Sequence, residues 1–198
     1  MVKLKLFIQA KAFQWKEQIH TFCHFYPRFA LVDLCLGVFS FFYNPYRVCR
    51  KFRAGVYGET PLRGFKALME AAGVGKRDQY VELGSGRGRT CFWAALFVGC
   101  QVRGVEWVPL FVGVSKFLNT LFCLSIQFEQ KSMFDADLAK ATVVYIYYLS
   151  DLEKLPLHQL PSGAKIITIS EPISGFSVVK TLPIVFPWGK TTAYIHIK

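Results

Sequence analysis

The feature that most constrains this chain is a run of three alternating glycines placed directly after a short apolar stretch. The run reads Val81-Glu82-Leu83-Gly84-Ser85-Gly86-Arg87-Gly88, and a helical pattern follows it. Glycine permits a positive φ and a close approach of the backbone to a ligand, and the next helix N-terminus offers free N–H groups. A strand, such a loop and a helix predict a parallel α/β sheet with a ligand site at the loop.

The glycine spacing, one residue shorter than in a dinucleotide site, and two nearby carboxylates indicate the kind of ligand. Glu82 stands two residues before the first glycine, where it would repel a pyrophosphate and attract the ammonium of a bound amino acid. Glu106 ends the next predicted strand, where an acid can accept both hydroxyls of a ribose. The pair predicts S-adenosylmethionine (SAM) as the cofactor. A plain strand-to-helix turn and a solvent-facing acid are the alternative interpretations.

From residue 55 to 198, helical and strand patterns alternate. We predict helices over 62–72, 90–98 and 111–122, and parallel strands over 80–83, 102–105, 125–129, 142–147 and 164–169. Thr60 is the expected N-cap of the first helix. Two β-rich runs, 178–186 and 191–197, predict a closing antiparallel hairpin. The expected fold class is α/β: a Rossmann-like seven-strand methyltransferase sheet covered by helices, with a C-terminal hairpin, preceded by an α-helical N-terminal segment.

Residues 1–54 are predicted to be a basic, apolar helical segment ahead of a SAM-dependent methyltransferase domain over 55–198. Residues 1–66 contain eleven Lys and Arg against three acids, which suggests an anionic partner or a solvated surface. An amphipathic helix is expected before Pro27. The apolar run 29–42 contains Asp33 and is shorter than the ~20 residues of a membrane span. The segment either attaches to an anionic membrane surface or packs on the catalytic domain.

The six cysteines form no C-x-x-C pair and no cluster with zinc spacing. We therefore expect no metal site, and free thiols in a reducing compartment. No cleavable signal peptide is evident. These features predict a cytoplasmic protein, with peripheral attachment or anchoring at the inner membrane as the alternative.

The residues around the glycine loop resemble the non-SET histone lysine methyltransferases. The stretch Val56-Tyr57-Gly58-Glu59-Thr60-Pro61, a helix and then Leu83-Gly84-Ser85-Gly86 carry the resemblance. It extends weakly through 104–106, 141–145, 163–167 and 193–196. The layout is similar also to the small protein-lysine methyltransferases that act on the ATP synthase c-subunit, whose sequence reads like residues 133–144 here and which carry a hydrophobic segment before the catalytic domain.

The resemblance implies a set of cofactor-binding residues. Those at the methionyl end of SAM are Tyr57, Glu59, Thr60, Glu82, Gly84, Ser85, Gly86 and Gly88. Those at the ribose and adenine are Glu106, Trp107, Ser132, Met133 and Phe134. Ser132 stands where those enzymes carry an acid, so adenine recognition would pass to Ser132, to the backbone or to Asp135.

Tyr147 and Tyr148 are the candidate catalytic residues, in place of an Asn pair in the histone enzymes. Neighbouring residues at a strand end face opposite sides, so at most one of the two tyrosines is expected to point into the site. Trp107, Phe134 and Trp188 are possible walls of an aromatic channel for a lysine side chain. The expected function is therefore protein-lysine N-methylation. An RNA, lipid or small-molecule acceptor and a non-catalytic SAM-binding scaffold are the alternatives, although no RNA-binding module is visible.

Overall fold

The computed structural model describes residues 12, 16, 27–52, 58–147 and 151–198. The helix predicted ahead of Pro27 falls almost wholly outside these residues, and Tyr57, Tyr148 and the predicted boundary between 54 and 55 lie outside them. The division into two segments therefore stays a prediction.

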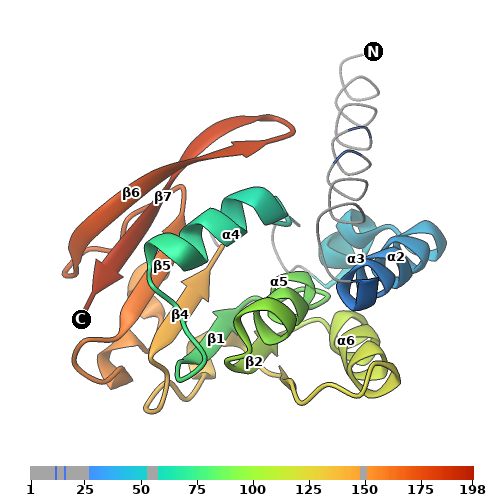
Figure 1. The fold of residues 1–198 in the computed structure, drawn as a ribbon, viewed down its shortest axis with the longest axis horizontal. Helices are drawn as coiled ribbons and strands as arrows, with labels where there is room; N and C mark the ends of the chain where they lie inside the picture. Colours follow the sequence, from blue (N-terminus) through green and yellow to red (C-terminus); the bar gives the residue numbers. More distant parts are fainter. Residues whose placement is uncertain (1–11, 13–15, 17–26, 53–57, 148–150) are drawn as a thin grey trace.

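A seven-stranded sheet forms the centre of the molecule (Figure 1). Its strand order is β3-β2-β1-β4-β5-β7-β6, and β7 runs antiparallel to both of its neighbours, β5 and β6. The predicted seven-strand sheet with a C-terminal hairpin is confirmed. The strands are β1 (Gln79–Leu83), β2 (Gln101–Glu106), β3 (Gln127–Gln130), β4 (Val143–Ile146), β5 (Lys165–Ile169), β6 (Ser177–Phe186) and β7 (Gly189–Ile197).

The helices lie at the N-terminal side and between the first strands. They are α2 (Pro27–Phe42), α3 (Pro45–Lys51), α4 (Leu62–Ala71), α5 (Arg89–Trp93) with its π-helical continuation η1 (Ala94–Val98), and α6 (Pro109–Leu121). Three of them begin with proline, whose fixed φ suits the first helical position and whose missing N–H is not needed there. In the described residues, no helix is long and apolar enough to cross a membrane.

The predicted capping role of Thr60 is wrong. Helix α4 begins after Pro61 without a side-chain cap, and the Thr60 hydroxyl instead hydrogen-bonds the phenol of Tyr145 on β4. Tyr145 is buried, and a buried hydroxyl without a partner costs about 1–3 kcal/mol. The Thr60 hydroxyl therefore serves as the buried partner of Tyr145 and does not cap α4.

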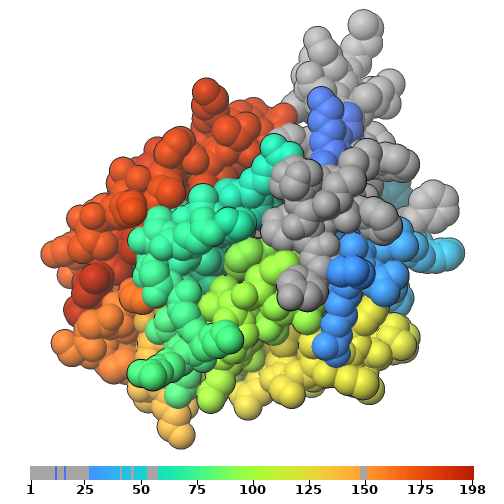
Figure 2. Space-filling model, viewed as in Figure 1, coloured from blue at the N-terminus to red at the C-terminus, as the bar shows by residue number. Residues whose placement is uncertain are grey.

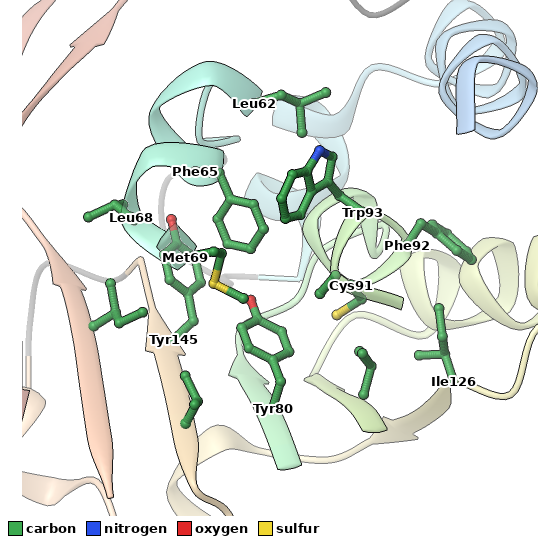
Figure 3. Packing of buried hydrophobic residues seen from close by; sticks show 14 of the residues in the cluster. Leu62, Phe65, Leu68, Met69, Tyr80, Cys91, Phe92, Trp93, Ile126 and Tyr145 are labelled. Atoms are coloured by element: carbon green, nitrogen blue, oxygen red, sulfur yellow. The ribbon is translucent and has the colours of Figure 1, made fainter. Parts of the chain in front are cut away.

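One face of the sheet packs against the described α-helices. Phe65 of α4 contacts Tyr145, Trp93 and Tyr80, with ring centroids 5.2, 5.4 and 6.2 Å apart and near-perpendicular planes. Figure 3 shows Phe65 between the two tyrosines of the sheet and the indole of α5. Edge-to-face pairs of this kind add about 0.5–1.5 kcal/mol beyond burial. This cluster holds the N-terminal end of α4 beside the glycine loop.

The other face is covered by loops and the short 3-10 turns η2 (Met133–Asp135), η3 (Leu152–Lys154) and η4 (Leu157–Gln159). The expected covering by helices is therefore right for one face only, within the described residues. The connections 131–142 and 170–176 must cross back over the sheet in few residues. The connection after β4 contains Pro156 and Pro161, which disfavour a helix interior.

The β6–β7 hairpin extends past the end of the sheet where the glycine loop lies. Helix α4 lies directly against it (Figure 2). The approach is close, because a Cβ added to Gly64 would come 3.0 Å from the Ile184 side chain. The hairpin turn is thereby held next to the end of β4.

Candidate functional site

The glycine loop is attached to the end of β2 by its own backbone. The N–H groups of Gly84 and Ser85 both donate to the carbonyl of Val105, at 2.9 and 3.0 Å. Gly88 then begins α5 with φ +76°, and a Cβ there would lie 2.7 Å from the Phe128 ring. Position 88 thus requires glycine twice, for its backbone conformation and for the close approach of β3.

Glu106 lies beside this loop, as predicted from the end of β2. Its carboxylate accepts hydrogen bonds from the N–H groups of Gly86 and Val108, both at 2.8 Å. Burial raises the pKa of this carboxyl, although these backbone donors act in the opposite direction. One acid therefore fixes the glycine loop to the start of α6 and places a carboxyl group at the position expected for a ribose.

Glu82 lies under the loop and is buried. Its carboxylate accepts hydrogen bonds from Thr90 at 2.6 and 2.7 Å, from Tyr80 at 3.0 Å and from the Cys91 thiol at 3.1 Å. Burial raises its pKa from 4.5 to about 7, and the hydrogen bonds only partly counteract this. All three donors are neutral side chains, and among the residues that the structure describes no cation pairs with this carboxylate, so a cationic ligand group would supply a countercharge.

One pocket gathers most of the residues predicted for the methionyl end. Its lining includes Glu59, Thr60, Glu82, Gly84, Ser85, Gly86 and, from the end of β4, Tyr147. Tyr147 reaches the pocket because Gly58 has no side chain: a Cβ there would lie 2.9 Å from the tyrosine ring. Tyr147 is thus placed at the pocket, and Tyr148 lies outside the described residues, so the expectation that at most one of the two tyrosines faces the site stays a prediction.

The residues predicted for the adenine end lie beside that pocket, outside its lining. The Met133 methyl is 3.6 Å from where a Gly84 Cβ would stand. The Ser132 hydroxyl accepts from the Phe134 N–H at 3.3 Å and caps η2. Trp107 follows Glu106 and is exposed. Of these four residues, Met133 contacts the glycine loop.

Two arginines that the sequence did not single out connect this site to α2. Arg87, inside the glycine loop, donates to the Leu36 carbonyl at 2.7 Å and to the Ser40 hydroxyl and the Glu59 carboxylate. Arg89, in the first turn of α5, donates to both oxygens of Asp33, at 2.6 and 2.9 Å. Their position at the start of a predicted helix could have singled them out, because a cation at a helix N-terminus is unfavourable unless it is paired.

An aromatic row runs outward from the pocket. The Tyr147 ring lies 5.3 Å from Phe186 on β6, and Phe186 stacks on Trp188 at 4.9 Å. Trp188, in the hairpin turn, is exposed. Trp188 was predicted as a wall and Phe186 was not, because its strand pattern gives no sign that it would meet β4.

Residues 44–143, just over half of the chain, match the family model of the histone methylation protein DOT1. The chain belongs to the DOT1 family. No curated protein sequence matches this DOT1-family chain. Its family and its seven-strand fold make it a SAM-dependent methyltransferase.

Solved structures of other methyltransferases share the fold of this DOT1-family protein. An RNA methyltransferase from Salinibacter ruber, crystallised with S-adenosyl-L-homocysteine, is 26% identical over 71% of this chain and 94% of its own, with a TM-score of 0.63. A geranyl diphosphate C-methyltransferase from Streptomyces coelicolor A3(2) is 14% identical over 70% and 77%, with a TM-score of 0.59. A methyltransferase from Pyrococcus furiosus is 12% identical over 70% and 83%, with a TM-score of 0.56.

Proposed function

We propose that this DOT1-family protein transfers a methyl group from SAM to the ε-amino group of a lysine in a protein substrate. The observation that carries the proposal is the aromatic row of Tyr147, Phe186 and Trp188, which leads from the pocket at the glycine loop to solvent. A lysine side chain is long and apolar up to its terminal amine, so a row of ring faces suits its stem and its cationic end.

The pocket residues fit SAM. The buried Glu82 carboxylate lacks a cationic partner in the described residues, and the ligand's α-ammonium would provide one. The Ser85 hydroxyl, on the same pocket, is buried and has no hydrogen-bond partner in the described part of the chain. Glu106 would accept from the ribose hydroxyls, and Met133 and Phe134 would border the adenine. SAM supplies an electrophilic methyl on a positively charged sulfur.

The protein must then align and deprotonate the acceptor. Methyl transfer requires a near in-line approach at about 3 Å with water excluded. An apolar aromatic channel lowers the pKa of a lysine inside it, because burial disfavours the charged form. The Tyr147 ring, fixed between Gly58 and Phe186, would orient the amine. These residues position and desolvate the nucleophile, and the sulfonium needs little help to leave.

RNA is the second candidate acceptor. It is favoured by the similarity to an RNA methyltransferase and by the formal net charge of +11, because phosphate contacts need Lys and Arg. The lysine proposal ranks first because the family model describes a histone methylation protein.

Transfer of tritium from labelled SAM into a cell extract separates these candidates. After incubation with the purified protein, the extract is divided into protein, RNA and lipid fractions. The lysine proposal expects label in protein that acid hydrolysis releases as methylated lysine. Label confined to RNA would replace it with the second candidate, and label confined to lipid would reject both. A Glu82→Gln/Glu106→Gln variant controls for contaminating methyltransferases.

A further inference from the structure

Helix α2 is apolar on both of its faces. Phe29, Val32 and Leu36 are buried in the core against α5. Leu31, Leu34 and Val38 lie on the opposite side and are exposed; their i, i+3, i+7 spacing is that of one helical face. A large apolar helix face in solvent is unfavourable unless something covers it.

Helix α6 continues this surface. Leu110, Phe117 and Leu121 are exposed on one side of it, again at the spacing of one helical stripe. The two helices lie side by side (Figure 1), and Phe117 contacts Phe39 of α2 at a ring-centroid distance of 6.0 Å. The two stripes and the partly buried Phe39 between them form one surface, which we call the α2–α6 face.

The α2–α6 face cannot turn inward. The buried ion pair of Asp33 with Arg89 and the hydrogen bond from Arg87 to the Leu36 carbonyl fix the rotation of α2 about its axis. Turning the outward leucines into the core would break this pair and leave an unpaired buried charge, which costs about a hundredfold or more in the folding equilibrium.

The rim of the α2–α6 face is cationic. Arg28, Arg47, Arg50 and Lys51 are exposed on α2 and α3, and Lys116 is exposed on α6. The sequence has no acid in 27–52 except the buried Asp33, and none in 109–128. An apolar face with a basic rim has the composition of helices that lie in a membrane interface.

We propose that the α2–α6 face docks in the plane of an anionic lipid membrane. Its apolar side chains would enter the acyl boundary, and the basic rim would contact the headgroups. A second copy of the chain fits less well, because a two-fold contact would bring two cationic rims together. Residues 1–26 carry four Lys and one Glu, so their net charge is positive and is not complementary to the cationic rim either.

Vesicle sedimentation of the full-length protein without SAM tests this proposal separately from methyl transfer. Phosphatidylcholine vesicles are compared with vesicles that also contain phosphatidylglycerol. The patch variant is Val38→Ser/Leu121→Ser, where the exposed fractions are 50% and 55%. The matched control is Val185→Ser/Val179→Ser on β6, where they are 52% and 55%. Circular dichroism checks that both variants are folded.

We expect the wild type and the control to bind anionic vesicles, and the patch variant to partition at least several-fold less. Arg47→Gln/Arg50→Gln should lower partitioning by about fivefold per charge, only when phosphatidylglycerol is present. Equal partitioning of the patch and control variants overturns the proposal. A wild-type protein that does not bind anionic vesicles overturns it as well. A dimer in size-exclusion chromatography that the patch variant alone dissociates, without loss of vesicle binding, assigns the face to a second copy instead.

Discussion

The carboxylate of Asp33 in α2 accepts two hydrogen bonds from the guanidinium of Arg89 in α5, at 2.6 and 2.9 Å, and both side chains are buried. Arg89 is the first residue of the helix that follows the glycine loop. Asp33, the charge that interrupts the apolar run of α2, therefore bonds α2 to α5, the helix that follows the glycine loop.

Replacing Asp33 by Asn should destabilise the protein by about 3 kcal/mol, because Arg89 would remain buried without its countercharge. The free energy of unfolding in urea measures this. We also expect weaker SAM binding by calorimetry, since α5 begins directly after the loop. The control is Glu70→Gln, which removes the exposed pair with Lys66 and should cost less than about 1 kcal/mol. Equal losses in the two variants would contradict a structural role for the Asp33 pair.

Glu82 should make SAM binding depend on pH. With a pKa of about 7, its ionised fraction rises about sixteenfold from about pH 5.5 to about pH 7, below the range where an α-amino group loses its proton. Because the ionised form attracts the ligand's ammonium, the dissociation constant of wild type should fall by a similar factor. Glu82→Gln should bind weakly with little change over this range. A wild-type affinity that stays flat with pH would contradict this role.

Rising pH should have the opposite effect on folding stability: through the Glu82 carboxyl it strengthens SAM binding but lowers the free energy of unfolding. Its pKa is higher in the folded protein than its ordinary value of 4.5, so the folded state binds more protons between the two values. Its contribution to the free energy of unfolding is therefore present below pH 4.5 and is lost as pH rises through 7, by roughly 3 kcal/mol. Chemical denaturation of wild type and Glu82→Gln over this window measures the difference. If the wild type gained stability relative to the variant as the pH rises, the sign would be reversed and the raised pKa of Glu82 would be disproved.

Gly88→Ala should cost roughly 3 kcal/mol. The residue has φ +76°, and the new methyl would meet the Phe128 ring at 2.7 Å, so left-handed strain and overpacking add. Gly163→Ala is the matched control, because Gly163 has φ +80° but nothing within 4 Å of the added atom. It should cost about 1 kcal/mol. Thermal denaturation of both separates the two contributions; similar melting temperatures would mean that the ring moves aside without cost.

The aromatic row should act on the acceptor and leave the cofactor unaffected. Under the lysine proposal, Trp188→Ala removes one ring face, and kcat/KM for the protein substrate should fall by about 2- to 30-fold with unchanged SAM affinity. Tyr147→Ala should lower kcat more strongly, because Tyr147 is the ring that lines the pocket. Tyr147→Phe keeps the ring and should retain most activity. Steady-state kinetics with calorimetry tests this, and a Phe variant as inactive as Ala would point to the hydroxyl instead.

Local sequence patterns were enough to predict the seven-strand sheet and the loop at which we place the cofactor. The strands, the hairpin and the glycine loop follow from local patterns: apolar runs, alternating glycines and an acid at a strand end. The two carboxylates Glu82 and Glu106 could be predicted in the same way, because the carboxyl ends of adjacent parallel strands meet at one edge of the sheet.

Contacts between residues that are distant in the chain could not be predicted in this way. Thr60 bonds Tyr145, Arg89 bonds Asp33, and Phe186 continues the ring row of Tyr147. In each pair the two residues are far apart in the chain, and local periodicity contains no information about which of many buried polar groups or rings will be brought together. Burial then decides the outcome, because a charge or hydroxyl removed from water must find its partner wherever the fold supplies one.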